Sequence, residues 1–379
     1  RKTAMRTFDV IQGGRSQEPP RMHRGRGCAS LKSVPTGDTF TPSRLRWARE
    51  RLMLTRADLA DAANISVSTL TAYENGRRVP LAEAKERLAD ALGVRPEFFY
   101  LPDMDEVPME EVSFRKASKT SKCQQRAAMG AAQMAVEFFG VIESSFKLPD
   151  LQVPEIDDAT PEQAAEEVRA QWHLADRPIA DMMSLLESKG VRILSLDHRC
   201  KDVDAFCFSR DGVSYIFVST VKTAERQRFD LAHELGHLVL HAGVPADSAN
   251  SKERERQADS FASAFLMPAS RIYTQSMKGA PVERILKAKK YWQVSAMAMA
   301  RRLHDLKLLS DWQYRSVVIE LSQRGYRSAE PDGIQREQSQ LLRKVLFMMD
   351  EHTTTADTAA ALHLTTDVVR TYLRDLTLT

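Results

Sequence analysis

Two histidines and a glutamate stand at a spacing that could hold a metal ion and use it. The segment His233-Glu234-Leu-Gly-His237 lies inside an apolar run, residues 229–240. On an α-helix, residues four apart differ by about 40° around the axis, so His233 and His237 project from one face and can bind one cation. Glu234 sits about 100° away, where it can deprotonate a water in the open fourth position of a tetrahedral zinc site. The pattern predicts a zinc hydrolase.

A third ligand is expected from a second helix downstream. Apolar residues recur at helical spacing up to Pro268, which predicts an amphipathic helix on which Glu255 and Asp259 share a face. We expect Glu255 to bind the metal and Asp259 to accept a hydrogen bond from a ligand histidine. Glu253 is a competing ligand, and Asp259 itself is a further candidate. His241, four residues past His237, either extends the cluster or packs near the end of its helix.

Three stretches of this region together resemble a known family. They are HELGH at 233–237, ExxAD at 255–259 and FASAFLMP at 261–268. They resemble the ImmA/IrrE family of bacterial metallopeptidases, a gluzincin-like group. The resemblance implies that His233, His237 and Glu255 hold Zn²⁺ and that Glu234 is the catalytic base. It also implies a peptide or protein substrate, and the class cleaved by such proteins is the helix-turn-helix repressor.

A small antiparallel sheet is predicted immediately upstream. Its strands are expected at 191–196, 205–209 and 213–218. Asp211-Gly212 between the last two is typical of a hairpin turn. The last strand leads into the metal helix, for which Thr220 or Thr223 could be the N-cap. Such a strand could pair with an extended peptide beside the metal or simply pack as a hairpin, and the sequence favours neither.

A second informative region, residues 41–101, indicates DNA binding instead of hydrolysis. Apolar residues at helical spacing predict short helices around one core. A helix over 55–63, a turn and a second helix over 67–76 resemble the Cro/C1 (XRE) helix-turn-helix, a five-helix, all-α domain. Ser66 is expected to cap the second, recognition helix and to present its first amides to the DNA backbone.

The same resemblance implies which side chains meet DNA. Those facing base edges in the major groove would be Val67, Ser68, Thr71 and Ala72. Those reaching phosphates would be Arg44, Arg56, Arg77 and Arg78. No Asn, Gln or Arg stands among the base-facing residues for paired hydrogen bonds, so site preference is expected to depend on DNA shape, half-site spacing or a basic arm. The alternative is a protein-interaction domain that binds no DNA.

Composition sets the class of protein. With 379 residues, 43% hydrophobic and 28% charged, the chain is expected to be soluble, with two or three domains. No apolar run approaches the roughly 18 residues that span a bilayer, so we expect no membrane partner. The cysteines at 28, 123, 200 and 207 show no CxxC spacing. This favours reduced thiols and a cytoplasmic protein.

Charge is concentrated at the N-terminal end. Residues 1–40 hold eight Lys or Arg against three acids, so of the net +3 this segment carries +5 and the rest −2. Low apolar content predicts a disordered basic tail that either assists DNA binding or is incidental. Because it begins with Arg, it is also consistent with a truncated or over-extended reading frame.

The remaining chain divides by composition. Residues 102–123 switch from acidic to basic, which predicts a linker. We expect a zinc peptidase domain over 124–275 and a helical C-terminal region over 276–379. Within that region, 291–322 predicts a helical cap. The segment 356–372 shows helix-turn-helix periodicity, for a second DNA contact, dimerisation or packing. The predicted fold class is α+β and mostly helical.

These features predict a DNA-binding transcriptional regulator with a zinc-dependent peptidase domain, which couples proteolysis or signal sensing to transcription. The rival is a non-catalytic repressor or antitoxin-like regulator whose peptidase-like domain senses a ligand, metal or partner. A third interpretation is a DNA-binding switch that depends on metal. Expected partners are a double-stranded DNA operator, a protein or peptide substrate and, from operator symmetry, a second copy in a homodimer.

Overall fold

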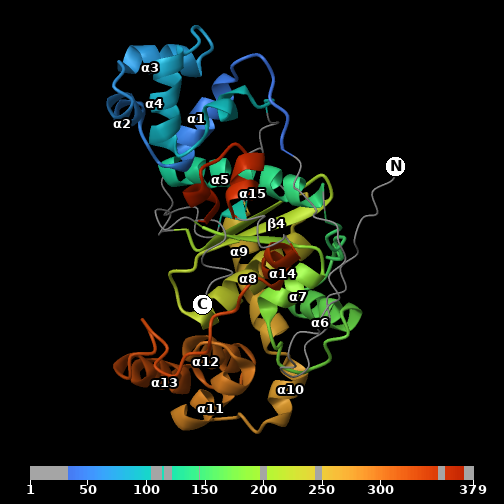
Figure 1. Cartoon of the computed structure of the whole chain (residues 1–379). Helices are drawn as coiled ribbons and strands as arrows, with labels where there is room; N and C mark the ends of the chain where they lie inside the picture. The colour runs from blue at the N-terminus through green and yellow to red at the C-terminus, as the bar shows by residue number, and fades with distance from the viewer. Residues whose placement is uncertain are drawn as a thin grey trace.

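The computed structural model describes residues 33–103, 113–114, 122–144, 146–196, 203–243, 250–348 and 355–370. Most of the predicted basic tail and linker lie outside these residues, as do Cys28 and Cys200. The fold is α+β and mostly helical, as predicted. Figure 1 shows a small helical lobe at the top and a larger body, which contains the sheet, beneath it. No helix in the described part of the chain combines the length and apolar character needed to cross a bilayer.

The upper lobe has the five helices expected of it. They are α1 (Pro42–Arg51), α2 (Arg56–Ala62), α3 (Val67–Glu74), α4 (Ala82–Leu92) and the 3-10 helix η1 (Pro96–Tyr100). Capping residues set where helices begin. Thr55 and Asp58 form a capping box at α2, and Ser66 accepts from the amide of Thr69 at the start of α3, as predicted. The apolar faces close over fully buried Leu45, Leu59, Leu70, Leu88 and Phe99.

The body is built on a four-stranded sheet. In the order β1-β3-β4-β2, its strands are β1 (Ser113–Phe114), β3 (Ala205–Arg210), β4 (Val213–Val218) and β2 (Arg192–Ser195). β3 and β4 form the predicted hairpin, with Asp211 and Gly212 both at positive φ. β2 pairs with β4 in parallel, so the sheet is mixed where we expected it to be antiparallel. Because β3 is antiparallel to β4, β2 also runs antiparallel to β3.

Helices cover both faces of this sheet (Figure 1). On one face lies α5 (Lys122–Glu143), where the ring of Phe139 packs 6.1 Å from that of Tyr215. On the other lies α8 (Ala224–Leu240), where the Sγ of Cys207 is 3.7 Å from the backbone oxygen of Glu234. Behind α8 pack α6 (Pro161–Gln171), α7 (Met182–Ser188) and α9 (Ser251–Leu266).

The remaining helices lie at the lower end of the molecule, beside α7 and against the upper lobe. The lower end of the molecule in Figure 1 consists of α10 (Ala269–Thr274), α11 (Val282–Trp292), α12 (Ala296–Asp305) and α13 (Asp311–Gln323), and the helical cap predicted over 291–322 corresponds to α12 and α13. After α14 (Gln340–Met348), α15 (Thr355–Ala361) returns to the upper lobe. There the amide of Arg95 donates to the oxygen of His363 at 2.9 Å, and the amide of Thr365 donates to the oxygen of Gly93 at 3.1 Å. A second DNA contact, dimerisation and packing were the three roles considered for this segment. Its contacts with the upper lobe support packing.

A buried ion pair joins the upper lobe to the body. Arg44 of α1 is 1% exposed, and its Nη1 donates to Oε2 of Glu137 in α5 at 2.7 Å. Its Nε also donates to the oxygen of Pro102 at 3.0 Å. The expectation that Arg44 reaches a DNA phosphate does not fit this arrangement, because α5 covers the guanidinium. The close approach of α1 to α5 occurs at Gly130, where an added Cβ would lie 3.2 Å from the oxygen of Trp47.

Candidate metal centre and DNA-binding surface

The helix α8 places the two motif histidines side by side. It begins at the predicted cap Thr223, whose Oγ1 accepts from the amide of Arg226. His233 and His237 follow one helical turn apart, and their Nε2 atoms are 3.1 Å from each other. Both rings are buried. The pair faces α9, which packs directly against α8.

A glycine lets the second helix come close enough to complete the cluster. A Cβ built on Gly236 would lie 3.2 Å from Cα of Ala258 and 3.1 Å from Cδ1 of Phe261, so a larger residue would push α9 away. This approach brings Glu255 to the histidines. Its Oε1 is 3.2 Å from Nε2 of His237, and its Oε2 is 3.6 Å from Nε2 of His233.

These separations fit a tetrahedral zinc site. Zinc–nitrogen and zinc–oxygen bonds of about 2.0–2.2 Å place neighbouring ligand atoms about 3.3–3.6 Å apart. The observed separations are 3.1 Å between the two Nε2 atoms, and 3.2 and 3.6 Å from these atoms to the two carboxylate oxygens of Glu255. Glu253, the competing candidate, instead pairs with exposed Arg256 at 2.7 Å, on the solvent side of α9. Among the described residues, His233, His237 and Glu255 are the group that could share one ion.

Hydrogen bonds behind the rings determine where their lone pairs point. Nδ1 of His233 is 2.9 Å from Oδ1 of Asp259; the carboxylate can only accept, so this nitrogen carries the hydrogen. Nε2 of His241 donates to Oε1 of Gln257 at 2.8 Å, which leaves Nδ1 of His241 to accept from Nδ1 of His237 at 3.0 Å. Both Nε2 atoms then direct a lone pair at the same point as the carboxylate of Glu255. Such a set of acceptors is favourable when a cation lies between them.

The electrostatics keep these rings in the neutral form, which is the form that could bind a metal ion. Burial lowers the pKa of His237 to about 4, and burial also lowers the pKa of His241, so neither ring is charged at neutral pH. Burial and the negative charge of Glu234 raise the pKa of Cys207 well above its usual value. The thiol therefore stays protonated and packs beside the site.

The other polar side chains near the motif differ in how close they lie to the cluster. Glu234 is fully buried on the same helix, beside His233. The side chain of Glu255 is 29% exposed, so solvent reaches the cluster from the α9 side. Tyr215 packs under α5 on the far face of the sheet, and Arg226 is held by Asp204, so neither lies at the cluster. His241 contacts the cluster through His237.

Gln257 is a site residue that the motif spacing did not predict. The available signal was His241 itself, because a histidine one turn beyond a ligand histidine needs an acceptor for its second nitrogen. Gln257 lies two positions after Glu255, on the side of α9 that faces His241. It extends the hydrogen-bonded chain that begins at His237.

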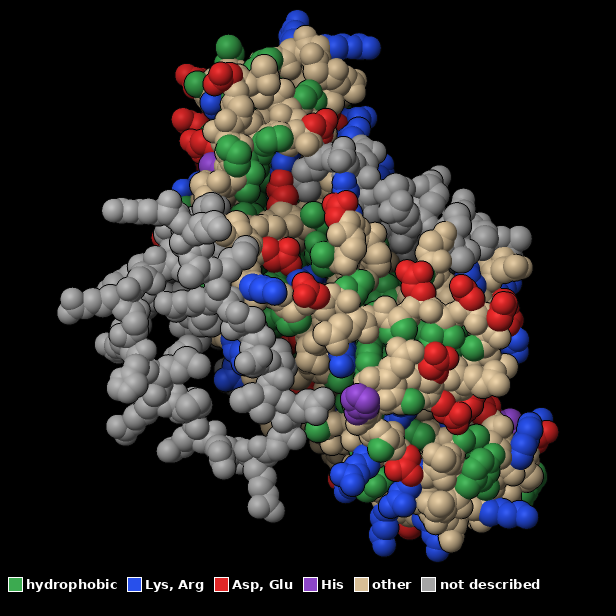
Figure 2. Space-filling view, turned by 90° about the vertical axis from the view of Figure 1, so that its right-hand side faces the viewer, with side chains coloured by type: hydrophobic (Ala, Val, Ile, Leu, Met, Phe, Trp, Pro, Cys, Tyr) green, Lys and Arg blue, Asp and Glu red, His purple; other side chains and the backbone are tan. Residues whose placement is uncertain are grey.

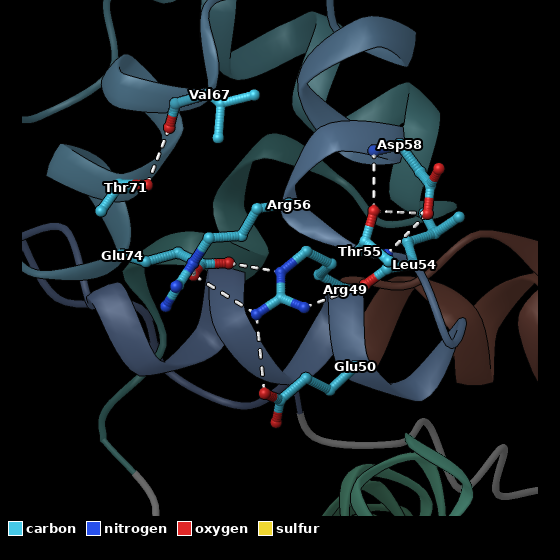
Figure 3. Close-up of polar contacts among 9 residues, drawn as sticks. All are labelled: Arg49, Glu50, Leu54, Thr55, Arg56, Asp58, Val67, Thr71 and Glu74. Atoms are coloured by element: carbon cyan, nitrogen blue, oxygen red, sulfur yellow. Dashed lines mark hydrogen bonds and ion pairs between the residues drawn. The ribbon is translucent and has the colours of Figure 1, made fainter. Parts of the chain in front are cut away.

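The recognition helix α3 lies at the outer end of the upper lobe, away from the body (Figure 1). Val67 is 47% exposed, Ser68 is exposed, and Thr71 and Ala72 are half-buried. The hydroxyl of Thr71 donates to the oxygen of Val67 at 2.8 Å, as Figure 3 shows. The surface of α3 is therefore rich in methyl groups.

The predicted phosphate contacts differ in their availability. Arg77 and Arg78 are exposed directly after α3, and Figure 2 shows Lys and Arg side chains at the outer end of this lobe. Arg56 is 46% exposed, but its Nε donates to Oε2 of Glu74 at 2.6 Å. Figure 3 shows Glu74 between Arg56 and Arg49, whose Nε lies 2.5 Å from Oε1. Buried Glu74, whose structural role the sequence did not predict, ties α1, α2 and α3 together.

Comparison with known families agrees with both regions. Residues 186–304 match the peptidase M78 family, described as the IrrE N-terminal-like domain, and this segment contains the whole metal cluster. Residues 45–99 match the helix-turn-helix family and contain α3. No curated protein matches the chain significantly. The chain therefore carries both domains that the sequence resemblances predicted.

Proposed function

For a chain that joins a helix-turn-helix domain to an IrrE-like domain, we propose a transcriptional regulator that binds operator DNA and hydrolyses peptide bonds with zinc. The observation that carries the proposal is the convergence of His233, His237 and Glu255, whose facing nitrogen and oxygen atoms lie 3.1–3.6 Å apart, with Asp259 and His241 orienting the two rings. Regulators of DNA act where DNA is, so we also propose a cytoplasmic location.

The proposed chemistry assigns one role to each side chain. His233, His237 and Glu255 would hold Zn²⁺, which when bound would polarise the substrate carbonyl and lower the pKa of a water. Glu234 accepts the proton of that water and returns it to the departing amine nitrogen. Asp259 and His241 keep the rings oriented throughout. Water and peptide approach from the α9 side, where Glu255 is exposed.

The DNA-binding role would use α3 and the residues that follow it. Val67, Ala72 and the methyl group of Thr71 can contact thymine methyls in the major groove, while Ser68 can bond to a base edge or a phosphate. Arg77 and Arg78 are free to reach phosphates, as are the first amides of α3. We propose that two copies bind a two-fold operator. By resemblance to the ImmA/IrrE group, the substrate would be a helix-turn-helix repressor.

One observation favours a second candidate, a regulator that senses metal or ligand without turnover. The body contacts the DNA-binding lobe through Arg44 and Glu137 and also through the segment after α15. A change at the metal site therefore has physical routes to the lobe. In this alternative the cluster binds metal, and Glu234 has no catalytic task.

A comparison of matched variants tests the proposal. Purified protein should contain one zinc per chain by elemental analysis and should cleave a repressor or an unstructured protein such as casein. Glu234→Gln should keep the zinc and the DNA affinity but lose hydrolysis by a factor of about 10²–10⁴. Glu253→Gln, on the exposed side of α9, is the control and should behave as the parent.

The outcomes separate the candidates. A protein that contains zinc but cleaves no substrate would favour the second candidate, the regulator that senses metal or ligand without turnover. Absence of zinc, with Glu255→Ala indistinguishable from the parent in metal content, would remove the metal centre altogether. Equal cleavage by Glu234→Gln and the parent would exclude Glu234 as the base.

A further inference from the structure

The lower end of the molecule, residues 269–327 from α10 to the turn after α13, has a large excess of positive charge. It holds twelve Lys or Arg against four acids, whereas the upper lobe, residues 42–101, holds ten against eight. Lys289 and Arg302 are buried and pair with acids outside the lower end. The other ten basic side chains are exposed, and Figure 2 shows Lys and Arg gathered on this part of the surface. A positive potential that attracts anions therefore lies at the end opposite the helix-turn-helix domain.

The four acids of the lower end already have basic partners there. The pairs are Glu283 and Glu320 with Arg324, Asp305 with Arg301, and Asp311 with His304. Exposed pairs of this kind contribute little to stability, but they engage every acid of the lower end. Most of the exposed Lys and Arg side chains are therefore left with no acid of the lower end to neutralise them.

Two turns meet at one junction of the lower end, the turn before α11 and the turn before α13. The amide of Gly279 donates to the oxygen of Leu308 at 2.8 Å and joins the two turns. Lys278 and Lys307 each precede one of these residues, and both side chains are exposed. The fold therefore brings together two exposed lysines that lie 29 positions apart in the sequence.

Two arginines extend the charge at this junction. Nη1 of Arg284 donates to the oxygen of Ser276 at 2.9 Å, which holds its guanidinium at the turn before α11. The hydrogen bond from His304 lowers the pKa of Asp311, and the charge of Arg315 lowers this pKa further, so Arg315 lies near the start of α13. The four residues that we call the junction patch are Lys278, Arg284, Lys307 and Arg315.

An exposed tryptophan adjoins the junction patch. Trp312, at the start of α13, is 76% exposed. A Cβ built on Gly279 would lie 3.4 Å from Nε2 of Gln313, so the start of α13 lies against the joined turns. The indole N–H can only donate a hydrogen bond, as can the Lys and Arg side chains around it. The whole surface therefore favours a partner that offers many acceptors and negative charge.

We propose that the junction patch binds the phosphate backbone of a second duplex DNA segment, so that one chain bridges two segments. DNA is the polyanion that a helix-turn-helix protein meets, and basic side chains bind its backbone without regard to sequence. α3 and the lower end lie at opposite ends of the molecule (Figure 1), so a straight duplex across α3 leaves the patch free for another duplex. The bridging rests on the proposed operator contact, whereas the affinity of the patch for DNA does not.

The salt dependence of binding gives the expected size of the effect. Each phosphate that a cation neutralises contributes about 0.9 to the slope of log K against log salt. Replacing three cations of the patch should therefore reduce this slope by about 2.7. When salt rises from about 50 to 200 mM, the affinity of such a variant should fall about 40-fold less than that of the parent.

The experiment uses the full chain and a fluorescent duplex of arbitrary sequence. The test variant combines Lys278→Gln, Lys307→Gln and Arg315→Gln. The matched control removes the same charge from exposed residues elsewhere, by combining Lys147→Gln, Lys252→Gln and Arg343→Gln. Anisotropy titrations at several salt concentrations give the slope for each protein, and thermal unfolding reports whether each variant is folded.

Bridging is measured separately. A biotinylated duplex on beads is saturated with protein, free protein is washed away, and the capture of a second, fluorescent duplex is recorded. The parent and the control should capture the second duplex, whereas the test variant should not. Arg77→Ala combined with Arg78→Ala should also lose capture, because it weakens the contact of the upper lobe, but it should keep the part of the slope that the patch contributes.

Equal slopes in the test variant and the parent would overturn the proposal, as would equal capture of the second duplex by these two proteins. A reduction of the same size in the control would assign the effect to net charge and would also overturn it. Patch-dependent binding of single-stranded DNA or of phosphatidylserine vesicles, with none of duplex, would reject duplex DNA as the partner. If the Arg77 and Arg78 variant keeps the full slope while the test variant loses part of it, the operator contact is wrong and the patch is supported.

Discussion

Glu187 and Glu337 cap each other's helices: each carboxylate accepts hydrogen bonds from the first amides of the helix to which the other glutamate belongs or which it directly precedes. Glu187, in α7, accepts from the amides of Gln340 and Leu341 at 3.0 and 2.9 Å, where α14 begins. Glu337, just before α14, accepts from two amides where α7 begins, and it also pairs with Arg228 of α8. The first amides of a helix have no partners within it, so both carboxylates stabilise a helix end. The exchange fastens α14 to α7, and the pair between Glu337 and Arg228 connects both to α8, the helix that carries the histidines.

The first prediction concerns the pH dependence of stability. Burial raises the pKa of Glu187 to about 7, against the hydrogen bonds from Ser339, Leu341 and Gln340. Because the folded pKa exceeds the unfolded value of 4.5, this contribution is complete below pH 4.5 and is lost as pH rises through 7. Between pH 5 and pH 8 the free energy of unfolding of the parent should fall by about 3 kcal/mol more than that of Glu187→Gln. Urea unfolding followed by tryptophan fluorescence measures this, with Glu253→Gln as control. Parallel curves for Glu187→Gln and the parent would contradict it.

The second prediction concerns the orientation of the ligand rings. Removing the partner of a ligand histidine typically weakens metal binding 10- to 100-fold. Asp259→Ala and His241→Ala should each lower zinc affinity by about that factor, measured by competition with a chelator. Gln257→Ala should have a smaller effect, because it acts through His241. Arg256→Ala, exposed on the same helix, is the control. Parent-like affinity in His241→Ala would mean that the ring of His237 is positioned by its own helix alone.

The third prediction concerns the joint between the lobes. Glu137→Ala leaves the guanidinium of Arg44 buried without its carboxylate, a change that typically costs about 3–5 kcal/mol. The upper lobe should then unfold before the body, and calorimetry should show two transitions where the parent shows one. The control is Glu143→Ala, on the same helix as Glu137. It removes a partly exposed pair with Arg192 of β2 and should cost about 1 kcal/mol or less. A single transition at the parent temperature in Glu137→Ala would show that the pair does not couple the lobes.

The fourth prediction concerns DNA affinity. Arg77→Ala and Arg78→Ala should each reduce the slope of log K against log salt by about 0.9, with equal loss on all sequences. Arg324→Ala, at an exposed position directly after the distant helix α13, should leave the slope unchanged. Anisotropy titrations of duplex DNA at salt concentrations between about 50 and 200 mM give the slope for each variant, because phosphate contacts change the affinity strongly over roughly this range. If all three variants share one slope, the residues after α3 do not contact phosphates.

Features set by local spacing were predictable from the sequence. The spacing of His233 and His237, the shared face of Glu255 and Asp259, and the Ser66 cap all follow from helix periodicity within a few residues. Features set by partners far along the chain were not. Arg44 is a typical phosphate contact by its position in a helix-turn-helix, and only α5, 93 residues away, makes it a buried joint.

Strand pairing shows the same division. The Asp-Gly turn predicted which strands pair as a hairpin, because the turn is local. It carries no information on which strands flank the hairpin. The parallel partner β2 and the short β1 reach their edges through connections that apolar periodicity does not describe.

The upper lobe is held by more than its covalent linker. α1 packs on α5 through Arg44 and Glu137, and the residues after α15 bond to Gly93 and Arg95. A backbone cut between 103 and 122 would therefore nick the protein without dividing it. Such a nicked protein should elute from a sizing column as one particle and should separate into two fragments only in detergent or denaturant.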